Sequence, residues 1–165
     1  MTRIRLRRLR LSDAPALAAY RSRPEVARYQ SWSDFSLAEA EALTAHEFGV
    51  EGEWSQLAVV RDNDLLIGDV GIHFEGERAE IGFTFAPEFQ RHGYATEAVR
   101  AVIDLLRKRG MREVIGIVDA RNVSAIALLR RLGFILQRTE TAEFKGAPCE
   151  EHVFALTLRS PSAAL

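Results

Sequence analysis

The residues best suited to bind an anion lie at positions 90–96, in the sequence QRHGYAT. An apolar stretch that favours a strand ends at Pro87 and a strongly helical stretch begins at Tyr94, so several backbone N–H groups are left unpaired at a helix start. Gly93 lets the backbone approach a ligand, and Arg91 adds positive charge where the helix dipole favours a phosphate. The turn is a candidate phosphate site. The alternative is an ordinary strand-to-helix connection in which the glycine only makes the turn.

A second group able to do chemistry is the carboxylate of Glu80, on the strand that runs into this turn. The apolar face of the alternating stretch 79–86 carries Ile81, Phe83 and Phe85. The other face carries Glu80, Gly82, Thr84 and Ala86. The small Gly82 leaves room beside Glu80 for a substrate group. The alternative is a structural carboxylate that pairs with Arg78 or another arginine.

Size and composition indicate one compact domain. The chain has 165 residues, of which 47% are hydrophobic and 27% are charged, and its net charge is −1. We place a single domain at residues 1–160 and predict a disordered tail at 161–165. Because the charge is nearly balanced, we expect neither nucleic acid nor an anionic membrane as a partner.

The cysteine and histidine content makes a metal site or a disulfide unexpected. Cys149 is the only cysteine, and the 4 histidines show no ligand spacing. His73 and His92 are weaker acid–base candidates than Glu80. We place Cys149 in a hairpin turn, without a base to activate it. No apolar run approaches about 18 residues and the start has no signal-peptide block, so the default location is the cytoplasm.

The apolar periodicity predicts strands and helices in a mixed order. Expected strands are 2–11 with a bulge near Arg8, 54–61, 65–74, 79–86, 112–120, 134–144 and 152–158. One helix is expected to begin near Ser12 and a short one to cover 25–29. A third runs from a Ser36 cap to near Gly49, and two more cover 94–109 and 122–131. The three strands before the phosphate turn form an antiparallel meander.

Two of the predicted segments can each be interpreted in two ways. The arginines of strand 2–11 form either a solvated face or an arm for nucleic acid or the ribosome, and the regular alternation favours the solvated face. Trp32 and Phe35 lie in a loop and either form a substrate lip or pin the loop to the core.

Two motifs in the second half of the chain together resemble the GNAT superfamily of N-acetyltransferases. The phosphate turn matches the pattern Q/R-x-x-G-x-G/A at Gln90, Gly93 and Ala95. The stretch NVSAIALLRRLGF matches N-x-x-S/A-x-x-L-x-x-x-x-G-F at Asn122, Ala125, Leu128, Gly133 and Phe134. The segments RLRRLRLSDAPAL, IGDVGI, AEIGF and GYATEAV are similar to the branch that includes ribosomal-protein N-terminal acetyltransferases. The resemblance covers nearly the whole chain.

The resemblance implies an α/β (α+β) fold with acetyl-CoA as co-substrate. Its mixed, mostly antiparallel twisted sheet of about seven strands would be flanked by helices and splayed between the fourth and fifth strands. The cofactor's pantetheine arm would run beside the backbone of Phe85. Its diphosphate would contact Arg91, His92, Gly93, Tyr94, Ala95 and Thr96. Asn122 would contact the arm near the thioester, or would only cap its helix.

The same resemblance implies N-acetylation of a primary amine by direct attack through a tetrahedral intermediate. Because an alkyl ammonium titrates near about 10, a base has to act, and Glu80 is the candidate. Ser124 is a further catalytic candidate, although the branch often has serine one position later, at Ala125. The tyrosine that serves many relatives as general acid is replaced by Leu129, so the acid is unassigned. A carboxylate of some relatives falls at Ile117, and Asp119 cannot inherit that role.

The acceptor and the assembly state are left open by the sequence. A protein N-terminus and a small-molecule amine both fit, and a homodimer is compatible with the sequence. A non-catalytic acyl-CoA-binding module is the alternative function. A dinucleotide-dependent oxidoreductase is disfavoured, because the GxGxxG fingerprint is absent and a meander precedes the turn.

Overall fold

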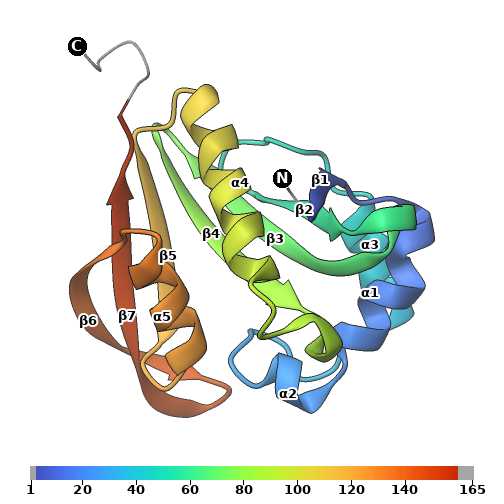
Figure 1. The fold of residues 1–165 in the computed structure, drawn as a ribbon. Helices are drawn as coiled ribbons and strands as arrows, with labels where there is room; N and C mark the ends of the chain where they lie inside the picture. The colour runs from blue at the N-terminus through green and yellow to red at the C-terminus, as the bar shows by residue number, and fades with distance from the viewer. Residues whose placement is uncertain (1–2, 160–165) are drawn as a thin grey trace.

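The fold is a single seven-stranded sheet covered by helices on both faces, seen in a computed structural model that describes residues 3–159 (Figure 1). The strand order is β1-β2-β3-β4-β5-β7-β6. The strands are β1 (Arg5–Arg8), β2 (Trp54–Val60), β3 (Leu66–Glu75), β4 (Arg78–Phe85), β5 (Glu113–Asp119), β6 (Ile135–Phe144) and β7 (Ala147–Thr157). The helices are α1 (Ala14–Arg21), α2 (Pro24–Ala27), α3 (Leu37–Thr44), α4 (Tyr94–Lys108) and α5 (Val123–Arg131).

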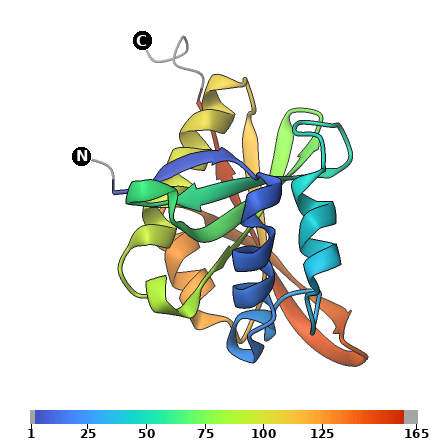
Figure 2. The same cartoon turned by 90° about the vertical axis from the view of Figure 1, so that its right-hand side faces the viewer.

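The alternation of each strand divides the core into two parts. Odd-numbered residues of β4 pack with the apolar side of α4, whose buried face includes Val99, Val102 and Leu106. The opposite face of β2 and β3 packs against α1 and α3, which lie side by side (Figure 2). The predicted meander of β2, β3 and β4 is confirmed by their antiparallel ladders. Glu80 and Gly82 therefore lie on the face of the sheet that α1 and α3 partly cover.

The predicted splay between the fourth and fifth strands is also present. β4 and β5 are parallel, and their ladder extends only from the pair Arg78–Glu113 to the pair Ile81–Gly116. Beyond Ile81 the two strands have no ladder, so residues 82–85 face an opening on that side. Since α4 follows β4 and α5 follows β5, both helices begin at the open end of the sheet (Figure 1).

A buried polar cluster attaches α1 to the centre of the sheet. The Asp69 carboxylate accepts hydrogen bonds from Tyr20 Oη, the Arg21 guanidinium and Gln56 Nε2. The Arg21 guanidinium also lies 4.2 Å from the centre of the Trp32 ring, and Trp32 Nε1 donates to the Arg21 carbonyl. The aromatic loop is thus pinned to the core, and the substrate-lip interpretation of Trp32 has no support.

Three elements differ from prediction by more than two residues at a boundary. β1 covers only Arg5–Arg8 and has no bulge, because the slip in its pattern marks the strand end. α3 ends at Thr44, short of the expected end near Gly49, and the chain then turns so that Phe48 packs edge-on against Phe74.

The third difference concerns β7, which begins at Ala147. Lys145 and Gly146 both have positive φ and form a tight two-residue turn, so Pro148 and Cys149 lie in the strand. The predicted placement of Cys149 in a turn is wrong, because the strand begins before Pro148, which is tolerated near a strand start. The predicted tail 161–165 lies outside the described residues.

Candidate active site

The turn between β4 and α4 presents a run of free backbone N–H groups. Arg91 has φ 64° and Gly93 has φ 80°, so the chain makes a compact left-handed turn before the helix. Within residues 3–159, no hydrogen bond engages the backbone N–H groups of residues 91–96. Since α4 contributes the positive end of its dipole here, the turn has the geometry and charge of an anion site.

The side chains of this turn differ in what they offer. The Arg91 and His92 side chains are exposed, and Ala95 packs against the core. Tyr94 is buried, with the guanidinium groups of Arg3 and Arg61 at 4.4 and 5.1 Å from its ring centre. Tyr94 therefore offers a ligand only its backbone.

Arg3 belongs to the site, although sequence reasoning did not identify it. Its backbone N–H and its Nε donate to the two carboxylate oxygens of Glu97 on α4. A Cβ placed on Gly93 would lie 3.1 Å from Arg3 Nη2, so this guanidinium borders the turn. The two residues of the ion pair are 94 positions apart, and no local pattern signals such a contact.

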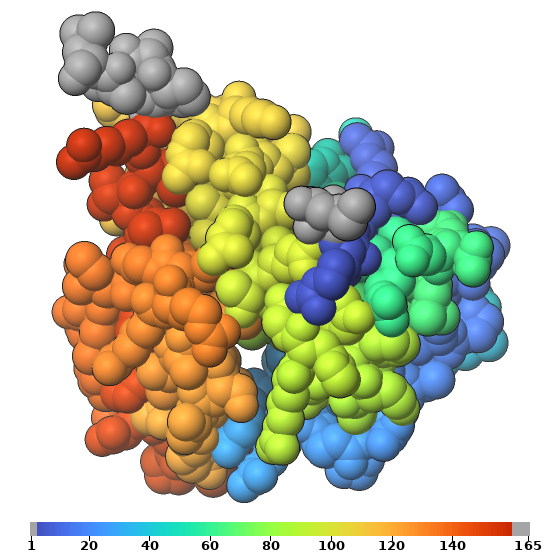
Figure 3. Space-filling model, viewed as in Figure 1, coloured from blue at the N-terminus to red at the C-terminus, as the bar shows by residue number. Residues whose placement is uncertain are grey.

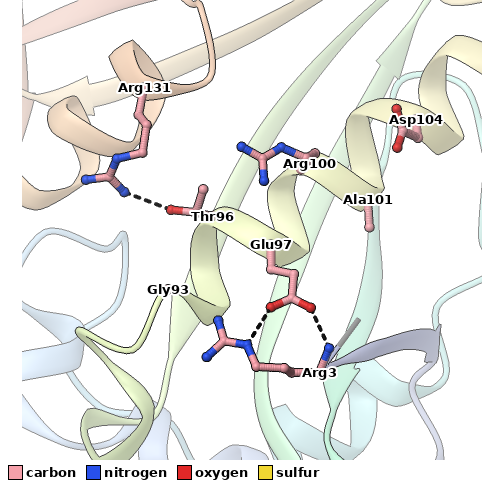
Figure 4. Close-up of a pocket in the computed structure, with 8 residues that line it drawn as sticks. All are labelled: Arg3, Gly93, Thr96, Glu97, Arg100, Ala101, Asp104 and Arg131. Carbon is pink, nitrogen blue, oxygen red and sulfur yellow. Dashed lines mark hydrogen bonds and ion pairs between the residues drawn. The ribbon is translucent and has the colours of Figure 1, made fainter. Parts of the chain in front are cut away.

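A depression of about 530 Å³ lies beside the first turns of α4 (Figure 4). Its lining consists of Arg3, Gly93, Thr96, Glu97, Arg100, Ala101, Asp104 and Arg131. Arg131 of α5 donates to Thr96 Oγ1 at 2.9 Å. Among the described residues Arg100 and Arg131 form no ion pair with a carboxylate, so both retain charge for an anionic ligand.

The splay between β4 and β5 opens next to the turn. Ala86 N–H donates to Ile67 O on β3, so by alternation the backbone groups of Phe83 and Phe85 point away from β3 and into the opening. Gln90 Nε2 donates to the Phe85 carbonyl at 3.0 Å. Figure 3 shows a hole through the molecule between α5 and the turn before α4, with α2 behind it. An elongated ligand on the turn can therefore reach the other face of the sheet.

Glu80 lies at the point where the ladder between β4 and β5 is about to end. It pairs across the sheet with His73 on β3 and Ile115 on β5. It is half-buried, and within residues 3–159 its carboxylate makes no hydrogen bond or ion pair. Burial raises the pKa of its carboxyl above the usual value, opposed by the charge of His73. Within the described residues, Glu80 therefore forms no structural ion pair with Arg78 or another arginine.

The predicted residues of the second motif lie at the start of α5. Asn122 Oδ1 accepts from the Ala125 N–H at 3.3 Å and caps the helix. Ser124 is exposed in the first turn. Leu129 is fully buried, and a Cβ on Gly116 would lie 2.9 Å from its Cδ1. Leu129 is thus next to the last paired residue of β5, at the base of the splay.

The remaining candidates for acid–base or nucleophilic chemistry are Asp119, His73 and Cys149, and the surroundings of each argue against a catalytic role. Asp119 is held by the backbone and guanidinium of Arg121, which lowers its pKa. His73 Nε2 lies 3.0 Å from the Gly52 carbonyl oxygen. Burial raises the pKa of the Cys149 thiol, which makes it a poorer nucleophile.

Residues 3–159 contain no group of three or more His, Cys, Asp or Glu side chains placed to hold a metal ion. No helix within the same range has the length and apolar character needed to cross a membrane.

Comparison with known proteins identifies the family. The acetyltransferase (GNAT) domain family matches residues 3–135. A protein of Bacillus licheniformis named uncharacterized N-acetyltransferase p20 is 30% identical over 95% of this chain and 94% of its own length.

Solved structures share the fold. Spermidine N-acetyltransferase from Vibrio cholerae, in complex with CoA and spermine, has a TM-score of 0.84 at 19% identity and covers 96% of this chain and 97% of its own. RimL, a ribosomal L7/L12 alpha-N-protein acetyltransferase in complex with coenzyme A, has a TM-score of 0.86 at 19% identity, covering 96% of both chains. With the family match, these findings show that the chain belongs to the GNAT family and is an acetyl-CoA-dependent acetyltransferase.

Proposed function

We propose that this protein transfers the acetyl group of acetyl-CoA to a primary amine by direct attack of the amine. One observation carries the proposal: the free N–H groups of residues 91–96 lie beside the open end of the ladder between β4 and β5. A ligand with a phosphate head and an extended arm matches that combination. The structural neighbours that contain CoA, one of them with spermine, support it.

The residues present fit the parts of CoA. The diphosphate would accept hydrogen bonds from the backbone of residues 91–96, with Arg91 adding charge. The pantetheine arm would lie beside Phe83 and Phe85, whose backbone groups face the opening. It would replace the Gln90 side-chain amide as the hydrogen-bond donor to the Phe85 carbonyl. The 3′-phosphate would lie in the depression near Arg100 and Arg131. Acetyl-CoA supplies the thioester carbonyl that is attacked.

The protein's own part in the reaction is to prepare the amine. In the proposed reaction a C–N bond forms, the C–S bond breaks, and the ammonium must give up a proton. Glu80 is the proposed acceptor of that proton, directly or through one water, because its carboxylate is half-buried and unpaired within residues 3–159. With Leu129 at the base of the splay, the proton for the departing thiolate comes from water or from a group that reaches the opening.

Asn122 and Ser124 keep separate proposed roles. Asn122 borders the opening at the start of α5, and we propose that its amide contacts the arm near the thioester while its Oδ1 caps the helix. Ser124, exposed in the first turn, is retained as a weaker candidate donor to the thiolate. Replacing each by alanine separates the two, since only loss of Asn122 should also weaken the helix.

The direct test is turnover. Purified protein is incubated with acetyl-CoA and a panel of primary amines, and free CoA thiol is measured against time. Release of thiol that depends on both substrates, with the acetylated amine identified by mass spectrometry, is the expected result.

Binding is measured on the same preparation. CoA at 100 times its dissociation constant should stabilise the fold by about 2.7 kcal/mol, which a thermal shift detects. A thermal shift with CoA but no turnover with any amine would instead favour a non-catalytic acyl-CoA-binding module. No shift at all would refute the cofactor site.

A further inference from the structure

The glycines of the central strands show where the fold leaves space. A Cβ at Gly68 would lie 2.5 Å from Phe85 Cδ1, one at Gly71 would lie 2.6 Å from Gln56 Oε1, and one at Gly116 would lie 2.9 Å from Leu129 Cδ1. A side chain at any of these positions would force neighbouring atoms to shift, so packing favours glycine there. A Cβ at Gly82 would meet nothing within 4 Å, and Gly82 has no positive φ. The fold itself gives no reason for glycine at position 82.

The free space in front of Gly82 has a defined surrounding. Gly82 pairs with Gly71 and follows Ile81, the last residue of β4 with a partner on β5. Its missing side chain would point to the same face as Glu80, opposite α4. The ring of Trp54 covers the neighbouring Gly71, with Cε3 3.1 Å from the position of a Cβ there. The indole thus forms a wall beside Gly82.

The other side of this space is apolar. Ile115 pairs with Glu80, so Ile115 and Ile117 of β5 share its face. Ile117 is 36% exposed although β5 is a central strand, and Trp54 on the other side of the space is 40% exposed. The helices α1 and α3 cover β2 and β3 and leave this strip open. The result is an open strip with a glycine floor, with Trp54 and Ile117 on its two sides and the Glu80 carboxylate at one end, which we call the Gly82 groove.

We propose that the Gly82 groove binds the acceptor, and that the acceptor is a small primary amine on an unbranched apolar chain, with its ammonium group at Glu80 and its carbon chain over Gly82. The proposal rests on the proposed acetyl transfer and adds the substrate class. Methylene groups fit the walls formed by Trp54 and Ile117, and the ammonium matches the unpaired carboxylate. A peptide N-terminus fits less well, because its first peptide group would lie against apolar walls without hydrogen-bond partners.

The proposal is tested by comparing acceptors and by substituting Gly82 with larger residues. Turnover of hexylamine and butylamine is measured beside an Ala-Ala-Ala peptide and a Ser-Ala-Ala peptide. The amines should have kcat/KM values at least 10-fold above those of the peptides. A preference for the peptides overturns the proposal and leaves acetyl transfer intact.

Gly82→Ala and Gly82→Val then fill the space in two steps. Because nothing lies within 4 Å and valine favours strands, both should fold with an unchanged or higher Tm and bind CoA normally. KM for hexylamine should rise with side-chain size, by about 10-fold or more for valine. Ile117→Ala should also raise this KM, whereas Ile135→Ala, which removes an exposed isoleucine from the outer strand β6, should not. An unchanged KM in Gly82→Val refutes the groove.

A second readout does not depend on turnover. In a Trp32→Phe background the fluorescence reports Trp54 alone, and hexylamine should change it in a saturable way that Gly82→Val abolishes. A Trp54 signal that saturating hexylamine leaves unchanged overturns the proposal even if the enzyme proves active on other amines.

Discussion

Glu80 differs from two other carboxylates of the central strands in its surroundings. Asp69 and Asp119 are each held by an arginine, whereas Glu80 forms no ion pair within residues 3–159. Glu75 and Glu151 are close enough to oppose its ionisation, and His73 and Arg78 favour it. Burial remains the largest influence, and it raises the pKa of Glu80. A carboxylate in such a place is a better proton acceptor than an ordinary surface glutamate.

Glu80→Gln should therefore lower kcat by about 100-fold or more and leave CoA affinity unchanged. The variant retains the size of the side chain and removes only the proton acceptor. Stopped assays of thiol release, with calorimetric titration of CoA, measure both quantities. Glu75→Gln is the control, since it changes a nearby charge at an exposed strand end. Turnover within a few-fold of the parent would exclude Glu80 as the base.

The raised pKa of Glu80 also predicts two pH dependences. Activity should fall as the pH decreases through the raised pKa, because the base becomes protonated. The stability that the neutral carboxyl contributes is present below its unfolded-state pKa and is lost as the pH rises through the folded-state pKa. Glu80→Gln should therefore be at least as stable as the parent at neutral pH. A lower Tm for the variant at pH 7, with normal activity per folded molecule, would indicate a structural role instead.

At the scale of elements, the turn before α4 can be tested with two glycines of equal backbone strain. Gly93 has φ 80° and Gly110, just after α4, has φ 83°, so valine should destabilise both sites by about 1–3 kcal/mol. Only Gly93→Val places a branched side chain at the proposed diphosphate site, so only this variant should lose CoA binding. Thermal melting gives the stability, and titration of CoA gives the affinity. Equal CoA affinity in two folded variants would remove the turn from the cofactor site.

The attachment of α1 to the sheet predicts a large loss of stability on a conservative change. Asp69→Asn leaves the buried guanidinium of Arg21 without a counter-charge, which should cost about 3–5 kcal/mol. Glu140→Gln, which removes the exposed pair with Arg138, should cost no more than about 1 kcal/mol. Urea unfolding of the two variants measures the difference. Similar losses would show that the Asp69 cluster does not anchor α1.

Local patterns were sufficient for most elements and for the position of the turn before α4. The cap of α3 by Ser36, the start of α4 after Gly93 and the cap of α5 by Asn122 each depend on residues within one turn of chain. The contact of Arg3 with Glu97 could not be predicted, because it depends on how β1 lies against α4. The wall that Trp54 forms beside Gly82 depends in the same way on strand register.

At the scale of the whole molecule, the sheet consists of two parts joined by a short ladder. Between β4 and β5, only the residue pairs from Arg78–Glu113 to Ile81–Gly116 join the two parts of the sheet. At the far side of the opening Lys145 Nζ donates to the Ala27 carbonyl at 2.8 Å, so the tip of the β6–β7 hairpin reaches the end of α2. The opening is thus bounded at one end by paired backbone and at the other by side-chain contacts, which include that of Lys145 and the hydrogen bond from Tyr29 Oη to the Arg121 carbonyl at 3.4 Å.

This arrangement predicts the pattern of amide hydrogen exchange. The amides of Phe83 and Phe85, which point into the opening, should exchange faster than those of Val70 and Ile72 within the β3 ladders. CoA should slow the exchange of Phe83 and Phe85 by at least 10-fold, beyond the general effect of ligand stabilisation. Mass spectrometry of short peptic fragments resolves the two strands. Equal protection of both pairs without CoA would show that the splay is closed in solution.

The splay also gives this protein two strand edges in the middle of its sheet. Within residues 3–159, the backbone N–H groups of Phe83 and Phe85 on β4 have no hydrogen-bond partner on this side, and such groups can pair with a foreign strand, as at any exposed sheet edge. The cofactor would then protect against aggregation as well as supply the acetyl group. Aggregation can be followed by light scattering at a temperature below Tm. Scattering should grow more slowly in a sample with CoA than in a sample that an osmolyte stabilises by the same free energy of unfolding.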